Sequence, residues 1–225
     1  MGLWFQEGSF LVKTLDSQEE MEAAFSLRHE VFCDELSWVP PSPDRKERDR
    51  YDGFAQSIGV FDEDMELVGN VRLIAAPDPF MVEKEFACLL PDNTELLKTA
   101  EMAEVTRLCV KKNTRNKKKH NNSPNISLLL YRGVYQWSLY NNIRHLTMVV
   151  EKNKYRLLRL ACLPVKALDS FKEMDGGVMA GALLLDLRHF EKEAAKKKPD
   201  FISWMSHRSY HSPSQVRRHG LYSLH

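Results

Sequence analysis

Hydrophobic residues recur every three or four positions from residue 17 to residue 36, with polar residues between them, which is typical of an amphipathic helix. Ser17 followed three residues later by Glu20 forms a capping box, in which each side chain binds a backbone N–H that the first helical turn leaves free. The prolines within residues 40–43 end the helix because proline cannot continue it. We therefore predict a helix over residues 17–36.

Strand and helix patterns follow one another along the rest of the chain. Apolar runs of strand length predict strands over residues 54–61, 66–75, 102–110, 145–150, 163–168 and 178–187, the first two forming a hairpin. Helical periodicity predicts helices near residues 82–90, 126–140, 152–160 and 189–198. This order predicts one α/β domain over residues 1–205, a mixed sheet with helices on both faces, and a loosely ordered tail over residues 206–225.

The 225 residues carry a formal net charge of +1, but the charges are unevenly distributed. Residues 1–104 contain 9 Lys and Arg against 23 Asp and Glu, whereas residues 105–225 contain 23 against 8. No acidic residue occurs between Val105 and Val150, where nine Lys and Arg lie. Two interpretations are open: different faces bind partners of different charge, or the two halves attract each other.

Several classes of protein do not fit the sequence. No run approaches the roughly 20 apolar residues of a membrane span, and the N-terminus lacks the pattern of a secretory signal. The eight histidines form no metal-binding motif, so we expect no metal site. The four cysteines lie far apart among apolar neighbours, which indicates buried free thiols in the reducing cytoplasm: Cys33, Cys88, Cys109 and Cys162.

The end of the first predicted helix carries one cation and two aromatic residues. Arg28 and Phe32 are one helical turn apart and point the same way, and Trp38 lies just beyond the helix. They could line an aromatic cleft with a cationic anchor. Alternatively, the two aromatic residues belong to the core and Arg28 is a partly buried ion-pair partner.

A charged cluster, residues 47–52, directly precedes the first strand of the predicted hairpin. Its three carboxylates, Glu47, Asp49 and Asp52, could bind an amine, or the segment could be an exposed polar loop. Arg72 lies inside an otherwise apolar strand, where an unpaired charge is costly. We therefore expect Asp49 or Asp52 to pair with Arg72.

The strand over residues 102–110 carries three further candidates. Strict alternation would place Glu104 and Thr106 on one face and Arg107 on the other, unless a β-bulge turns one of them. A partly buried Glu104 could accept a proton from an amine, directly or through water. The alternative is a structural ion pair between Glu104 and Arg107.

Taken together, these motifs resemble the acyl-homoserine-lactone synthases, the autoinducer synthases of bacterial quorum sensing. The shared patterns are R-x-x-x-F-x(5)-W from Arg28, E-x-D-x-[FY]-D from Glu47 and E-x-[ST]-R from Glu104, within residues 18–112. Residues 28–35 and 148–159 are also similar to the N-acyl amino acid synthases, including the exosortase-associated acyltransferases.

The resemblance implies a GNAT-type α/β fold, in which the middle strands of a mixed central sheet splay apart to admit a phosphopantetheine arm. It implies transfer of a fatty acyl group from an acyl carrier protein or coenzyme A thioester to a small amino compound, with no permanently bound cofactor. In the lactone synthases that compound is S-adenosylmethionine, and lactone closure follows acylation. The related synthases make a product that is not a lactone.

The resemblance also assigns roles to individual residues. Glu104 and Arg107 are the expected catalytic residues, Glu104 acting as the base while backbone donors stabilise the oxyanion. The residues expected to bind substrate are Arg28, Phe32, Trp38, Asp49, Asp52, Arg72 and Thr106. The charged members would form a network on the acceptor side, and the aromatic members would form the wall of the cleft.

The basic segment that follows this strand lacks the glycines of the usual GNAT pyrophosphate loop. Such a segment suits an acidic acyl carrier protein better than coenzyme A, although a solvated loop is an equal alternative. The residues expected to contact the carrier or its phosphate are Lys111, Lys112, Arg115, Lys117, Lys118 and Lys119.

Two functions of other classes were weighed against this prediction. A nucleic-acid-binding module would explain the acid-free stretch, but the aromatic residues cluster elsewhere and no recognised motif occurs, so we predict no nucleic-acid partner. An inactive acyl-binding regulator would keep the cleft without turnover, and the presence of Glu104 together with the charged network argues against it.

Overall fold

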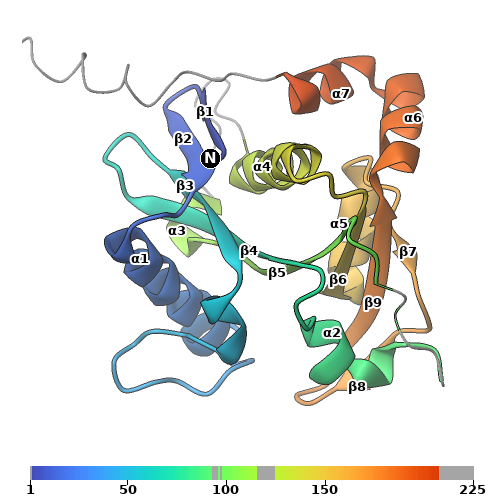
Figure 1. Cartoon of the computed structure of the whole chain (residues 1–225). Helices are drawn as coiled ribbons and strands as arrows, with labels where there is room; N and C mark the ends of the chain where they lie inside the picture. Colours follow the sequence, from blue (N-terminus) through green and yellow to red (C-terminus); the bar gives the residue numbers. More distant parts are fainter. Residues whose placement is uncertain (1, 93–95, 97, 116–124, 208–225) are drawn as a thin grey trace, which may run out of the picture.

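The computed structural model describes residues 2–92, 96, 98–115 and 125–207. These residues form a nine-stranded sheet in the order β1-β2-β3-β4-β5-β6-β9-β7, with β8 also paired to β9 (Figure 1). The strands are β1 Trp4–Glu7, β2 Phe10–Thr14, β3 Gln56–Phe61, β4 Leu67–Ala75, β5 Met102–Val110, β6 His145–Glu151, β7 Lys166–Ala167, β8 Lys172–Met174 and β9 Val178–Asp186. Neighbouring strands are antiparallel except β5 and β6, which are parallel.

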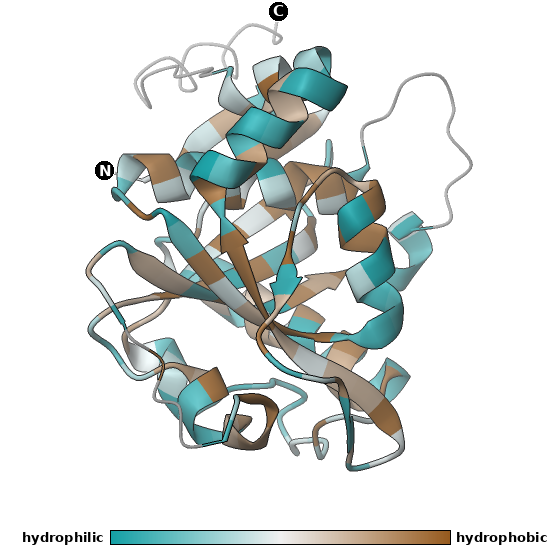
Figure 2. Ribbon diagram, turned by 90° about the vertical axis from the view of Figure 1, so that its right-hand side faces the viewer, coloured by the Kyte–Doolittle hydropathy of each residue, from teal (hydrophilic) through white to brown (hydrophobic). Residues whose placement is uncertain are grey.

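Helices cover both faces of the sheet, as the sequence predicts. They are α1 Gln18–Arg28, α2 Met81–Lys84, α3 Lys112–Arg115, α4 Ile126–Tyr140, α5 Lys152–Leu160, α6 Leu187–Lys197 and α7 Pro199–Ser206. Helix α1 packs against β4 and β5, whereas α4 packs against β2, β3 and β4 from the opposite side (Figure 1). In Figure 2 the strands in the middle of the molecule are mostly hydrophobic and the helices above them expose many hydrophilic residues.

The sheet opens between its two parallel strands. β5 and β6 pair only from Met102 opposite His145 to Glu104 opposite Thr147. Beyond this point β5 stays paired with β4, while β6 stays paired with β9 up to Glu151. The two strands therefore diverge from Glu104 onward, which confirms the splayed sheet expected from the resemblance.

Most of the predicted elements agree with the structure. The capping box of Ser17 and Glu20 is present, and β5, α4 and α5 have the predicted bounds. The predicted first helix consists of α1 followed by a π-helix, His29–Glu35. The hairpin β1–β2, strand β8 and helix α7 were not predicted, because short elements carry too little periodicity. The strand predicted over residues 163–168 is reduced to the two residues of β7.

The prediction of four buried cysteines is wrong in part. Cys33 and Cys109 are buried, Cys162 is partly exposed and Cys88 is exposed, and all four are free thiols. Cys88 lies in a single 3-10 turn, Ala87–Leu89, in which Leu89 supplies the buried side chain. In this turn Leu89 therefore makes the contact with the core, and its neighbour Cys88 stays exposed.

No helix in the described part of the chain is long and apolar enough to cross a membrane. Of the predicted tail, residues 208–225 lie outside the described residues.

Candidate active site

Glu104 lies where β5 and β6 diverge, and its side chain is 1% exposed. Its two carboxyl oxygens accept hydrogen bonds from the backbone N–H groups of Met81 (2.5 Å) and Val82 (2.8 Å). Burial raises the pKa of Glu104 to about 7, against the opposing effect of these two donors. Arg107 does not pair with Glu104 but donates to Glu47 and Asp49, so the alternative of a Glu104–Arg107 ion pair is wrong.

A β-bulge directs Thr106 and Arg107 to the same side of β5. The register between β4 and β5 shifts between Asn70 and Arg72, and Arg107 has a φ of 51°. As a result Thr106 accepts a hydrogen bond from Arg72 (3.0 Å), while Arg107 reaches Asp49 (2.8 Å). The bulge anticipated from the sequence is therefore confirmed, since strict alternation would separate the two side chains.

Three arginines and three carboxylates form a closed network beneath this bulge. Arg28 binds Glu47 (2.5 Å) and Asp52 (2.6 Å), and Arg107 binds Glu47 (3.0 Å). Arg72 binds both Asp49 (2.5 Å) and Asp52 (2.7 Å), which confirms the expected acidic partner for its buried guanidinium. The formal charges of these six residues cancel, and each of the six has an oppositely charged neighbour.

The segment that carries the carboxylates is a fixed part of the interior rather than an exposed polar loop. Glu47 and Tyr51 are 3% and 2% exposed. The Asp49 side chain accepts a hydrogen bond from the backbone N–H of Tyr51, and the Asp52 side chain accepts one from the N–H of Asp49. Burial favours a higher pKa for Asp49 and Asp52, but the neighbouring arginines outweigh it and hold the pKa of both carboxyls below the ordinary value.

The aromatic side chains form a wall above the network. The rings of Phe32 and Trp38 stack with their centroids 6.3 Å apart, and the guanidinium of Arg107 lies over the Phe32 ring at 5.7 Å. Phe32 is buried, whereas Trp38 is 46% exposed and marks the rim of the site.

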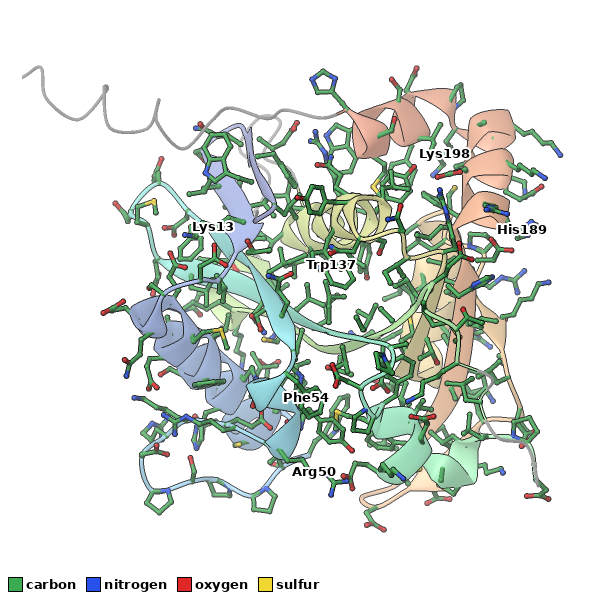
Figure 3. The ribbon with its side chains drawn as sticks, viewed as in Figure 1. Lys13, Arg50, Phe54, Trp137, His189 and Lys198 are labelled. Carbon is green, nitrogen blue, oxygen red and sulfur yellow. The ribbon has the colours of Figure 1, made fainter. Side chains whose placement is uncertain are left out.

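A cavity of about 1260 Å³ extends from this aromatic wall to residues of the central strands. Its polar end is lined by Asp49, Glu85, Glu104, Thr106 and Arg107 together with the two aromatic residues. Its other end lies against α4, β6, β9, α6 and α7 and is lined by side chains such as Val134, Met148, Leu163, Leu187, Phe190 and Met205. Arg50, at the lower end of Figure 3, lines the polar end, and Lys198, at the upper end, joins α6 to α7.

Arg28, Arg72 and Asp52 lie behind the cavity wall rather than in it. The side chains of Arg28 and Arg72 are 0% exposed, and neither lines the cavity. Direct contact of these two guanidinium groups with a substrate does not fit their burial. Their geometry instead fixes Asp49 and, through Glu47, Arg107.

The basic segment after β5 is largely paired with acidic residues of the first half of the chain. Lys111 pairs with Glu66, and Arg115 pairs with Glu35 (2.5 Å). Lys112 is exposed, and the remaining expected residues, Lys117, Lys118 and Lys119, lie outside the described residues. Lys111 and Arg115 are therefore engaged in ion pairs with the first half of the chain, and contact of this segment with a carrier stays a prediction.

The roles of three features of the site could not be read from the sequence. Glu47 is predicted there as a carboxylate that could bind an amine, but nothing in its position shows that it bridges two arginines. The amides of Met81 and Val82 are backbone groups, for which the side-chain sequence carries no signal. The basic residues of α5, which border the cavity through Lys154, were noted only as part of a helix.

A mixed sheet that splays at a buried glutamate, with a polar cleft and an apolar pocket on either side, defines an acyltransferase of the GNAT-like class. The chain belongs to the autoinducer synthase family, whose model matches residues 12–194. It is 29% identical over 169 residues to an acyl-homoserine-lactone synthase of Rhizobium radiobacter, covering 74% of this chain and 79% of that protein. A second such synthase, from Aeromonas salmonicida, is 26% identical over 70% of this chain and 75% of its own length.

Solved structures show the same fold at lower sequence identity. The AHL synthase LasI aligns with a TM-score of 0.73 and 21% identity over 85% of this chain and 96% of its own. BjaI, a CoA-dependent acyl-homoserine lactone synthase with MTA bound, aligns with a TM-score of 0.69 and 18% identity over 85% of this chain and 96% of its own. FeeM, an N-acyl amino acid synthase, aligns with a TM-score of 0.56 and 16% identity over 83% of this chain and 96% of its own. These comparisons agree with the family to which the sequence motifs point.

Proposed function

We propose that this acyltransferase makes an N-acyl-homoserine lactone from S-adenosylmethionine and a fatty acyl thioester. The observation that carries the proposal is the cavity that joins a polar cleft to an apolar pocket at Glu104. Asp49 and Glu85 line the polar end, where their carboxylates, although paired with arginines, offer hydrogen-bond acceptors to the amino group of the acceptor. The apolar end has the lining that a fatty acyl chain requires.

Acyl transfer begins with loss of a proton from the acceptor amine. Glu104 accepts this proton, directly or through a water molecule, and a pKa of about 7 lets it do so near neutral pH. The amine nitrogen then attacks the thioester carbonyl and the thiolate leaves. Because β5 is not paired with β6 beyond Glu104, backbone N–H groups on that side of the strand would stabilise the oxyanion.

Lactone closure needs no further oxidant or cofactor. A carboxylate oxygen of the acylated S-adenosylmethionine attacks the side-chain carbon bonded to the sulfonium sulfur. The carbon–sulfur bond breaks, and methylthioadenosine leaves with the electron pair. The network around Asp49 and Arg107 would hold the acceptor while both steps take place.

The donor that we propose is an acyl carrier protein thioester, used in the cytoplasm. Helix α5 borders the cavity through Lys154 and Leu157, and Leu157 and Leu160 are 56% and 74% exposed. Among the described residues no carboxylate forms an ion pair with its exposed basic side chains, which are Lys152, Lys154, Arg156 and Arg159. A basic surface with exposed leucines at the cavity rim suits an acidic carrier that delivers its acyl chain there.

Incubation of the purified protein with S-adenosylmethionine and a series of acyl thioesters tests the reaction. Mass spectrometry is expected to find an acyl-homoserine lactone and an equal amount of methylthioadenosine, both formed at least about 100-fold more slowly with Glu104→Gln. Acylation of amino acids without release of methylthioadenosine would contradict the lactone and favour the alternative that FeeM represents.

A charge reversal on α5 tests the donor. Lys154→Glu with Arg156→Glu is expected to lower kcat/KM for an acyl carrier protein donor about tenfold at low salt, with a smaller effect at high salt. Lys192→Glu on α6, which is exposed and lies outside the cavity lining, is the matched control. Equal losses with a short acyl-pantetheine donor would show that α5 does not recognise the carrier.

A further inference from the structure

The apolar end of the cavity is closed by an element outside the part of the chain that matches the family model. That match ends at residue 194, whereas α7 covers Pro199–Ser206. Met205 of α7 is 1% exposed and lines the cavity together with Phe190 of α6. In Figure 1 both helices lie at the end of the molecule opposite to α2, whose Met81 lines the cavity.

Helix α4 supplies the long wall of the same pocket. Ser127, Tyr131, Val134 and Tyr135 line the cavity at the spacing of one helical face. This face extends over about 12 Å along the helix axis at 1.5 Å per residue. An acyl chain that lies along this face of α4 can reach the side chain of Met205 on α7, which lines the same cavity.

Two side chains of α4 fix α7 in place. Gln136 donates from its amide nitrogen to the carbonyl oxygens of Met205 and His207, both at 3.0 Å. Arg132 donates to the His207 carbonyl oxygen (2.8 Å) and to the carboxylate of Glu7 (2.6 Å). These bonds satisfy carbonyl groups that the C-terminal end of a helix leaves free.

Aromatic packing holds Arg132 between two elements. Its guanidinium lies over the ring of Phe5 at 4.4 Å and over the ring of Trp204 at 4.9 Å. Trp204 also stacks on Phe201, which meets Phe190 edge to face. Because both ends of α7 are packed in this way, Met205 is a fixed wall rather than a mobile side chain on a loose segment.

We propose that Met205 is the residue that sets the longest acyl chain this enzyme accepts. The proposal rests on the proposed function, because it needs an acyl chain in the apolar pocket. A methylene that fits such a pocket gains affinity and one that meets its end wall loses it, a discrimination of roughly tenfold or more per methylene. Met205 thus limits the chain from the end opposite to Glu104.

The test compares acyl donors from butanoyl to tetradecanoyl with wild type and with variants of Met205. Met205→Ala is expected to move the optimum of kcat/KM to a longer donor and to raise the rate with the first over-long donor at least tenfold. Met205→Trp is expected to move the optimum to a shorter donor. The KM for S-adenosylmethionine is expected to stay unchanged, because Met205 is remote from the polar end.

Two controls separate the pocket from general effects on α7. Met205→Leu, which nearly conserves volume, and Ile202→Ala, at a partly buried position of α7 outside the cavity lining, are expected to leave the optimum unchanged. If Met205→Ala does not fold, Met205→Val makes a smaller change in the same direction. Thermal melting of each variant identifies loss of fold.

An unchanged chain-length profile in folded Met205→Ala or Met205→Val, and in folded Met205→Trp, would overturn the proposal. The profile is measured both as thiol release and as the mass of the acylated product. A product other than a lactone, with a profile that still shifts, would contradict the proposed function but support the role of Met205. Lactone formation with an unshifted chain-length profile would support the proposed function but contradict the role of Met205.

Discussion

The protonation of each carboxyl group in the site depends on the groups that contact it. The buried carboxyl of Glu104 has backbone N–H donors but forms no ion pair with an arginine of the described chain, and its pKa is raised to about 7. The carboxyls of Asp49 and Asp52 lie against Arg72, and their pKa values are lowered. Carboxyls of one site thus differ in protonation near neutral pH, which suits one of them to accept a proton and the others to stay charged.

Glu104→Gln is expected to lower kcat by about 10²–10⁴-fold, because the amide cannot accept the proton of the amine. In the wild type, kcat is expected to rise with pH through about 7 as Glu104 ionises. Steady-state rates of thiol release over a pH series measure both effects. A variant that keeps the wild-type rate and pH profile would remove Glu104 from the base role.

Arg72→Met is expected to destabilise the protein by about 3–5 kcal/mol, because it removes the central arginine of the network and leaves Asp49 and Asp52 with one arginine partner each. Chemical denaturation measures the change in the free energy of unfolding. Arg45→Met removes an exposed arginine, whose side chain is 70% exposed, and is expected to change stability by at most about 0.5 kcal/mol. Similar values for the two variants would show that the network is not a structural requirement.

At the scale of elements, the site depends on a β-bulge, on the end of one strand pairing and on the close approach of one helix to the sheet. The bulge in β5 turns Thr106 and Arg107 toward the network, and the end of β5–β6 pairing opens the cavity beside it. On the opposite face of the sheet, α4 approaches β2 and β3 at Gly133, where an added Cβ would lie 3.1 Å from Ile58 and 3.3 Å from Val12. A glycine in the middle of this helix therefore serves close packing, at a cost in helix propensity.

Gly133→Val is expected to destabilise the protein by about 1–3 kcal/mol, because the added methyl groups force α4 away from the sheet. Gly53→Ala is the control, since an added Cβ there meets nothing within 4 Å and its φ is not in the left-handed region. Thermal melting of both variants gives the comparison. A Gly133→Val protein as stable as the wild type would show that α4 can shift without cost.

At the scale of the whole molecule, the opposite charges of the two halves meet in ion pairs. Arg107, Lys111, Arg115 and Arg132 of the second half all pair with carboxylates of the first half. Of the two interpretations left open by the net charge of +1, attraction between the halves is thus supported by these contacts. The exposed basic residues of α5 have no such partner among the described residues and are the basis for the proposed carrier surface.

The stability of the whole molecule is expected to depend on the protonation of Glu104. Its pKa is about 7 in the folded chain and 4.5 as the ordinary value, so the folded state binds more protons between these values. The contribution of Glu104 to the free energy of unfolding therefore falls as pH rises from 4.5 to about 7, by about 3 kcal/mol.

Chemical denaturation of wild type and Glu104→Gln at a series of pH values measures this dependence. The difference in the free energy of unfolding is expected to shift in favour of the variant as pH rises through the interval. The lowered pKa of Asp49 and Asp52 acts in the opposite sense, since the stability they contribute is lost only as pH falls below their ordinary value of 3.8. A difference between the two proteins that does not change with pH would contradict the raised pKa of Glu104.

The sequence by itself determined the longer elements and the candidate chemistry. Periodicity over many residues identifies α4 and β5, and a charge inside an apolar strand requires a partner, as Arg72 does. Patterns of this kind depend only on side chains that are a few positions apart in the sequence. The family resemblance added the splayed sheet, because three motifs occur together in order.

Only the tertiary structure decided which of these residues meet and which face the cavity. Glu47 joins Arg28, 19 positions before it, to Arg107, 60 positions after it, and Met205 lines the same cavity as Glu104. Burial of Glu104 and pairing of Lys111 likewise depend on chain segments that are distant in sequence. The physical reason is that burial and charge pairing are properties of packed surroundings, which no local pattern contains.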